Sequence, residues 1–60
     1  MNKIKSFRKS KKISQKVLAE KLRVKQNTIS DWEREYRIPS LKKAIELAEI
    51  LEATVEEVFK

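Results

Sequence analysis

Residues 15–34, QKVLAEKLRVKQNTISDWER, decide how this chain folds. Apolar residues recur in this stretch at helical spacing, before and after a short link. The apolar set is Leu18, Ala19, Leu22, Val24, Ile29 and Trp32. Ser14 precedes the stretch as a good N-cap, and Ala19 is small where two helices must pass closely. The stretch therefore predicts two short helices, at about 15–22 and 26–34, that share one core.

Helical patterns continue outside this stretch. Ile4 and Phe7 give a thin apolar stripe to a helix at about 2–11. Pro39 is the only proline, and it marks residues 35–40 as the one non-helical stretch. The chain is therefore expected to begin with a short amphipathic helix, and residues 35–40 are expected to form its one longer non-helical segment.

The strongest periodicity follows the break, at about 41–51, and Ser40 can cap this helix. Its apolar face is expected to contain Leu41, Ala44, Ile45, Ala48 and Leu51, widened by Leu47 and Ile50. Thr54 and Glu57 then have the spacing of a capping box and open a last turn or two that ends near Phe59. Every segment is helical, so the predicted fold class is all-α, and no linker is long enough to divide the chain into two domains.

The composition excludes several classes of function. The chain has 60 residues, of which 40% are apolar; this suffices for one small core but not for a pocket that holds a sizeable ligand. It contains no His, no Cys and no Gly. Without them it lacks the usual proton shuttle, the usual zinc and thiol ligands, and a glycine-rich phosphate loop. We therefore expect no enzymatic activity, no metal or other cofactor, and no small-molecule ligand.

Apolar runs are short throughout. The longest, at residues 17–19, has three residues, whereas a membrane-spanning helix needs about 20 and the core of a signal peptide about 7–15. No disulfide can form without Cys, which fits a reducing compartment. We therefore expect no membrane association and a cytoplasmic location.

Charge is distributed unevenly along the chain. The net charge is +6, but residues 1–30 carry ten basic residues and one acid, a net charge of +9. Residues 31–60 carry five basic residues and eight acids, a net charge of −3. A basic block of this size attracts a polyanion, although a solvated lysine-rich surface is the simpler alternative. The pattern indicates that one face meets a polyanion and another avoids it.

The two helices predicted within residues 15–34 have the spacing of a helix-turn-helix, whose second helix lies in the DNA major groove. Such a helix needs an inner face held by a core and a short, polar outer face. The residues expected on the outer face are Gln26, Asn27, Ser30 and Asp31. Gln and Asn bind adenine N6 and N7, and Asp accepts from cytosine N4. The alternative, on spacing alone, is a three-helix bundle with one polar helix.

At these residues the chain resembles the lambda-repressor-like (Xre/Cro) helix-turn-helix family of bacterial and phage regulators. The resemblance covers nearly the whole chain through several segments in the family's order. These are IKSFR (4–8), ISQKVLAEKL (13–22), TISDWER (28–34), PSL (39–41), LAEIL (47–51) and VEEVF (55–59). The resemblance implies one compact five-helix domain over residues 1–60. It also implies a nucleoid-associated repressor of the Cro type, which binds operator double-stranded DNA as a homodimer on an inverted repeat.

The resemblance also assigns roles to individual residues. The phosphate-facing positions are Ser14, Gln15, Arg34 and Arg37. The base-facing positions are Gln26, Asn27, Ser30 and Asp31, with Lys25 just before them to reach either a phosphate or a guanine edge. Arg8 and Glu33 match an internal ion pair that joins the first and third helices, and Trp32 matches a core position.

The departures from the family's pattern are specific. Lys12, Arg23, Glu35 and Glu52 stand where the family commonly has glycine at helix ends. Either these residues adopt the left-handed conformation, at a cost of about 1–2 kcal/mol each, or the helices end differently. Lys25 stands in place of the usual Ser or Thr cap, and Val17 in place of the usual capping-box acid.

Asp31 has two possible partners. Phosphates that line the groove repel a carboxylate unless a cytosine amine binds it. Alternatively, Arg34, three residues further along the helix, neutralises Asp31 on the protein surface.

Two rival functions remain open at this level. The first is a protein-interaction module, such as an antitoxin or an adaptor, that uses the same fold. The second is a basic membrane binder, which is disfavoured because only Ile4 and Phe7 form an apolar wedge. If the chain forms a dimer, its interface is expected in the less basic C-terminal part, near Ile38, Val55, Val58 and Phe59.

Overall fold

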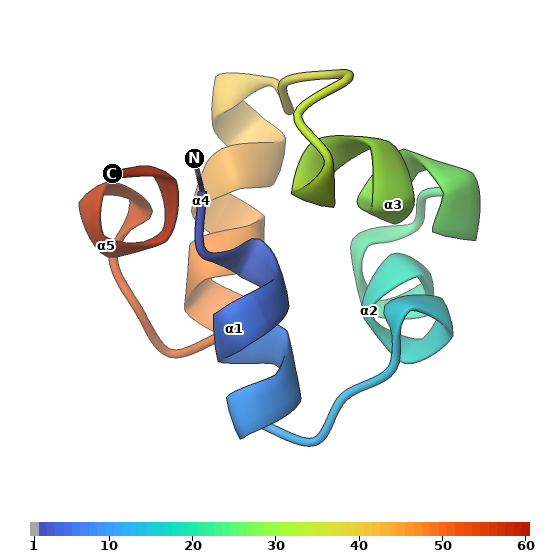
Figure 1. Ribbon diagram of the computed structural model, residues 1–60, viewed down its shortest axis with the longest axis horizontal. Helices are drawn as coiled ribbons and strands as arrows, with labels where there is room; N and C mark the ends of the chain where they lie inside the picture. The colour runs from blue at the N-terminus through green and yellow to red at the C-terminus, as the bar shows by residue number, and fades with distance from the viewer. Residues whose placement is uncertain (1) are drawn as a thin grey trace.

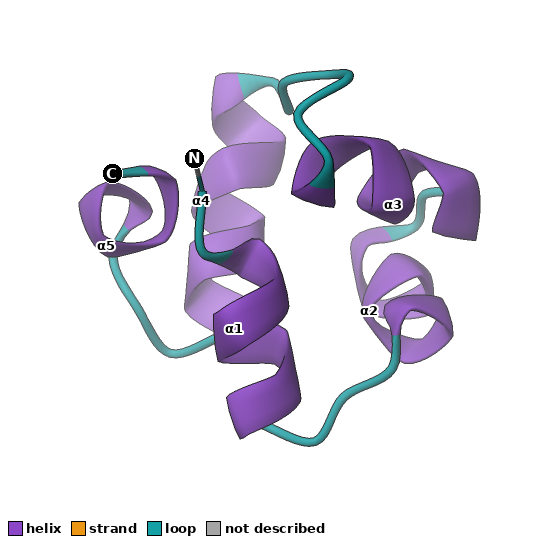
Figure 2. Cartoon of the chain, viewed as in Figure 1, coloured by secondary structure: helices purple, strands orange, loops and turns teal. Residues whose placement is uncertain are grey.

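A computed structural model describes residues 2–60, and it contains only helices within that range (Figures 1 and 2). They are α1 (Ile4–Ser10), α2 (Gln15–Leu22), α3 (Gln26–Glu33), α4 (Leu41–Ile50) and α5 (Val55–Phe59). The bounds agree with the predicted ones to within two residues, and the all-α five-helix fold is confirmed. Figure 1 shows α1 in front of α4 at the centre, α5 on one side, and α2 and α3 together on the other.

The core lies between all five helices. Its fully or nearly fully buried apolar residues are Ile4, Leu18, Ala19, Leu22, Ile29, Trp32, Leu47, Ala48, Leu51 and Val58. Trp32 is only 4% exposed, so the prediction that it is a core residue is confirmed. Val58 is fully buried, which corrects the expectation that it lies on a dimer surface, because its side chain fills the core under α5.

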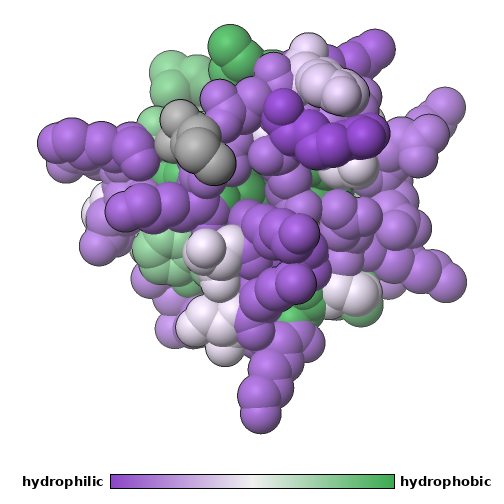
Figure 3. All heavy atoms as spheres, in the orientation of Figure 1, coloured by the Kyte–Doolittle hydropathy of each residue, from purple (hydrophilic) through white to green (hydrophobic). Residues whose placement is uncertain are grey.

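The apolar face of α4 is shifted relative to the predicted one. Leu41 and Ile45 were expected on this face, but their exposed fractions are 74% and 44%. Leu47 is fully buried, with Ala44 and Ala48 on one side of it around the helix and the half-buried Ile50 on the other. The reason is rotational: each residue advances about 100° around a helix, so Leu41 and Ile45 fall beyond the edge of the buried arc. Figure 3 shows hydrophobic spheres on the surface over the start of α4.

Non-glycine residues in the left-handed conformation follow four helices or their last turns. They are Lys12, Arg23, Glu35 and Glu52, with φ angles of 58°, 59°, 64° and 57°. The first of the two alternatives therefore holds, and each residue costs about 1–2 kcal/mol relative to a relaxed conformation.

Side-chain caps begin three of the helices. Ser14, Ser40 and Thr54 each accept a hydrogen bond from a backbone N–H in the first turn that follows. Thr54 and Glu57 form a complete capping box, as predicted. Lys25 precedes α3 without a side-chain cap, so the first N–H groups of α3 have no side-chain partner at that position. None of the helices in residues 2–60 has the length and hydropathy needed to cross a bilayer.

Candidate nucleic-acid interface

The turn between α2 and α3 sets the geometry of the site. Arg23, at φ 59°, reverses the chain, and the Val24 N–H donates to the Ala19 carbonyl at 3.0 Å. Ala19 is only 3% exposed, and its small side chain permits the close approach of the two helices. The Lys43 ammonium of α4 donates to the Leu22 carbonyl at 2.6 Å. This carbonyl is in the last turn of α2, where carbonyls have no partner within the helix. The turn thus sets the angle between α2 and α3, and the Lys43 contact joins the end of α2 to α4.

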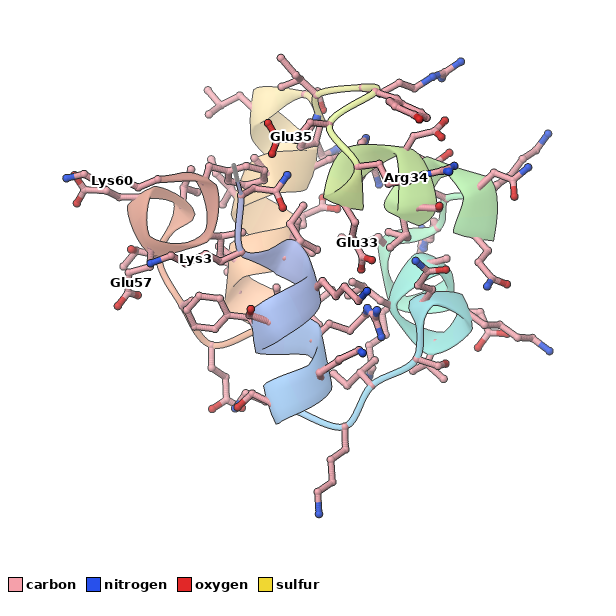
Figure 4. All side chains as sticks on the ribbon, viewed as in Figure 1. Lys3, Glu33, Arg34, Glu35, Glu57 and Lys60 are labelled. Atoms are coloured by element: carbon pink, nitrogen blue, oxygen red, sulfur yellow. The ribbon has the colours of Figure 1, made fainter. Side chains whose placement is uncertain are left out.

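A buried ion pair attaches α3 to α1. Arg8 Nε lies 2.7 Å from Glu33 Oε2, and Arg8 Nη2 donates to Glu33 Oε1 at 3.4 Å. The Arg8 Nη1 group also donates to the Ile13 carbonyl at 3.0 Å. The two side chains are 9% and 5% exposed. In Figure 4, Glu33 points from α3 into the space between α1 and α2. The pair implied by the resemblance is thus present, and both charges are partnered away from water.

A chain of hydrogen bonds leads from this ion pair to the surface of α3. The Gln15 Nε2 group donates to Glu33 Oε1 at 3.0 Å. The Gln26 Nε2 group in turn donates to Gln15 Oε1 at 3.4 Å. These two bonds orient both amides, since each amide has distinct donor and acceptor ends. Gln26 then keeps its Oε1 acceptor and one N–H donor, the combination that matches adenine N6 and N7.

The predicted base-facing residues lie together on α3 and at its start. Lys25, Gln26 and Asn27 are exposed, whereas Ser30 and Asp31 are half-buried. Ser30 and Asp31 lie one turn further along, so the exposed polar surface is concentrated in the first turn of α3. A helix that enters the major groove by its N-terminal residues presents its side chains in this order.

The predicted phosphate-facing residues fall into two groups. Ser14 and Gln15 lie at the beginning of α2, where the Ser14 hydroxyl accepts from the Val17 N–H at 3.0 Å. Arg34 and Arg37 follow α3, and both face Asp31. Arg34 Nη2 lies 3.7 Å from Asp31 Oδ1. The surface alternative for Asp31 is therefore the one present in this structure.

The contact between Tyr36 and Arg34 was not predicted from the sequence. The Arg34 guanidinium lies over the Tyr36 ring, 4.7 Å from its centroid. The only signal in the sequence is an aromatic residue two positions after an arginine, and side chains at this spacing do not face each other on a helix. Tyr36 is 72% exposed, so it adds an aromatic side chain to the surface beside α3.

Comparisons with known proteins agree with this geometry. The sequence model of the helix-turn-helix family HTH_3 matches residues 4–58. Among solved structures, this chain is similar to the biofilm master regulator SinR, crystallised in complex with DNA. The two share 33% sequence identity with a TM-score of 0.78, over 88% of this chain and 86% of the SinR chain. No curated protein matches the sequence significantly. Because the family match covers nearly the whole chain, the protein belongs to the HTH_3 family of Xre/lambda-repressor-like helix-turn-helix proteins.

Proposed function

We propose that this chain is a sequence-specific transcriptional regulator that places α3 in the major groove of double-stranded DNA and acts as a repressor. The observation that carries the proposal is the hydrogen-bonded path from the buried Arg8–Glu33 pair through Gln15 to Gln26. This path orients an exposed amide at the start of α3, as base reading requires. The similarity to SinR, whose crystal structure contains DNA, supports the proposal.

The proposed contacts divide into reading and positioning. Gln26 and Asn27 read adenine edges, with Ser30 beside them and Lys25 on a phosphate or a guanine edge. Gln15 retains one amide N–H that Glu33 does not engage, and this group binds a phosphate at the start of α2 together with Ser14. Arg34 and Arg37 bind phosphates beside the end of α3. This regulator is proposed to act without enzymatic activity or a cofactor, in the cytoplasm of a bacterium or of a phage-infected cell.

The operator is proposed to be an inverted repeat bound by two copies. A two-fold dimer of helix-turn-helix domains places its recognition helices about 34 Å apart, one helical turn of DNA. Each copy measures 23 × 23 × 19 Å, less than this spacing, so two copies can touch only where each extends from α3 toward the two-fold axis. Contact between copies is therefore small, and DNA supplies most of the energy of assembly.

Selection from a random duplex pool at near-physiological salt tests this function. We expect an inverted repeat with half-sites one helical turn apart and adenines opposite Gln26 and Asn27. Replacement of both residues by Ala removes the sequence preference and leaves a salt-sensitive phosphate affinity. The matched control replaces Ser6 and Ser10, two exposed neutral residues of α1, by Ala. A pool that returns no motif contradicts the proposal.

A protein-interaction module, such as an antitoxin or an adaptor, is the second candidate. The observation that favours it is the exposed apolar surface at Ile38 and Leu41, which are 88% and 74% exposed. Under this candidate, partner binding survives replacement of Gln26 and Asn27 by Ala but is lost when Ile38 and Leu41 become polar. The two candidates are separated because their essential residues lie on different elements.

A further inference from the structure

We propose that Asp31 is an internal counter-ion that competes with DNA phosphates for Arg34 and Arg37 and thereby weakens binding to DNA regardless of its sequence. This inference deepens the proposed function and rests on it. Its consequence is a weaker phosphate contribution on DNA of any sequence, so that the base contacts of α3 make up a larger share of the total binding energy.

The geometry gives each carboxylate oxygen its own arginine. Asp31 Oδ1 lies 3.7 Å from Arg34 Nη2, and Asp31 Oδ2 lies 3.6 Å from Arg37 Nε. The Asp31 side chain is 28% exposed, whereas the arginine side chains are 59% and 71% exposed. The acid is thus the most buried member of the group, and the two bases are the exposed members that DNA can reach.

The backbone after α3 brings both arginines to Asp31. The Asp31 carbonyl accepts from the Tyr36 N–H at 2.8 Å and from the Arg37 N–H at 3.4 Å. Glu35, at φ 64°, reverses the chain between them. Arg34 is further restrained by its contact with the Tyr36 ring. The three-charge cluster is therefore built by the local fold rather than by chance contact of long side chains; in Figure 4, Arg34 lies along the outer side of α3.

The strength of the cluster suits competition. Both separations exceed those of a hydrogen-bonded pair, and exposed pairs of this kind are weak and screened by salt. A phosphate that recruits Arg34 or Arg37 therefore displaces Asp31 at modest cost. Once displaced, the carboxylate faces a phosphate-lined groove and repels it, which opposes binding to DNA of any sequence.

Replacement of Asp31 by Asn tests the proposal, because it removes the charge and keeps the shape. We expect Asp31→Asn to bind a duplex without the operator about 2–10-fold more tightly than the wild type. The plot of log affinity against log salt steepens by about 1–2, since one or two further phosphates are neutralised. Fluorescence anisotropy over a range of salt concentrations measures both quantities.

The control is Glu20→Gln, which changes the net charge equally on α2, where Glu20 is exposed and has no ion pair among those found in residues 2–60. A second control places Asp31→Asn in a background with Arg34→Gln and Arg37→Gln. There we expect Asp31→Asn to change affinity no more than Glu20→Gln does. Equal effects of Asp31→Asn and Glu20→Gln in the unaltered background overturn the proposal.

A direct cytosine contact by Asp31 predicts the opposite pattern. In that case Asp31→Asn loses affinity for the selected operator and leaves other duplexes unaffected, which also overturns the proposal. Retention on heparin, a polyanion without bases, separates this inference from the proposed function. If the wild type binds no duplex DNA but Asp31→Asn elutes from heparin at higher salt than Glu20→Gln, the counter-ion role stands and the DNA-reading function fails.

Discussion

At the scale of single residues, the Arg8–Glu33 pair links stability to the site. Its two charges are nearly buried, so removal of one partner leaves the other buried without a counter-charge. We expect Arg8→Met to lower the free energy of unfolding by about 3–5 kcal/mol. The double variant Arg8→Met with Glu33→Met recovers most of this loss, because a well-packed apolar pair removes both desolvation penalties. Urea unfolding measures both, and a double variant no more stable than Arg8→Met contradicts the assignment.

A second pair, Lys11 with Glu52, makes stability depend on pH. Lys11 Nζ lies 2.7 Å from Glu52 Oε1. The hydrogen bond from Lys11, and then its positive charge, lowers the pKa of the Glu52 carboxyl below its ordinary value. A carboxyl with a lowered pKa stabilises the fold above its unfolded-state pKa, and this stabilisation is lost as the pH falls through its folded-state pKa.

The expected result is a small stability difference that depends on pH. Glu52→Gln lowers Tm slightly at neutral pH, and the difference from wild type disappears in acid. The effect is small because the carboxyl is exposed. Thermal melts across the acid range measure it, with Glu49→Gln, an exposed residue of α4, as the control. A difference that persists unchanged in acid would show that Glu52 acts by something other than its charge.

At the level of the helices, the left-handed residues that follow them are strained, so replacing such a residue by glycine should stabilise the fold. Lys12 has φ 58° and lies between α1 and α2. We expect Lys12→Gly to raise the free energy of unfolding by about 0.5–1 kcal/mol, because relief of strain exceeds the extra entropy of glycine in the unfolded chain. Lys9→Gly, the same exchange inside α1, should lower it by about 0.5–1 kcal/mol. Chemical denaturation checks both, and a loss of stability in Lys12→Gly contradicts the strain argument.

The helices were predictable from sequence to the extent that local chemistry defines them. The caps at Ser14, Ser40 and Thr54 mark helix starts by their local chemistry alone. The left-handed residues Lys12, Arg23, Glu35 and Glu52 mark the ends of the preceding helices. The face of α4 was not predictable in the same way. Its stripe is wide enough to admit more than one rotation, and only the positions of the other helices select which part of it is buried.

The candidate site shows the same division. The positions of Gln15, Gln26 and Glu33 on two helices follow from the sequence pattern. Their mutual hydrogen bonds do not, because side-chain partners across a turn depend on the packing angle between α2 and α3. The ring contact between Arg34 and Tyr36 depends on the loop conformation, to which no helical periodicity applies.

At the scale of the whole molecule, the remaining feature is a surface hollow between the α3–α4 loop and the C-terminus. It has a volume of about 290 Å³ and is lined by Asn2, Glu35, Arg37, Ile38, Pro39 and Phe59. Two residues of the expected dimer surface, Ile38 and Phe59, lie here, and Ile38 is 88% exposed. Val55 and Phe59 are both half-buried against the core, whereas Val58 is buried within it. We therefore expect the contact between copies to be centred on Ile38 and the rim of the hollow.

The hollow is lined by six residues, whereas a stable interface has about 20–30 residues on each side, so we expect this contact to be too small to hold two copies together without DNA. We expect a monomer in solution that binds two half-sites cooperatively. Ile38→Glu should retain the affinity for a single half-site and lose the cooperativity, because each two-fold contact would then bring two carboxylates together. Ile45→Glu, an exposed residue of α4 outside the hollow, is the control.

Gel-shift titrations on half-site and full-site duplexes distinguish the possibilities. If Ile38→Glu binds as cooperatively as the wild type, the contact between copies lies elsewhere on the molecule. If the wild type fills the two half-sites independently, the protein binds DNA as a monomer and no contact between copies is involved. Specificity would then rest on a single α3 with a short reading surface of Gln26, Asn27 and Ser30, so that each base contact would supply a larger share of the discrimination between the operator and other DNA.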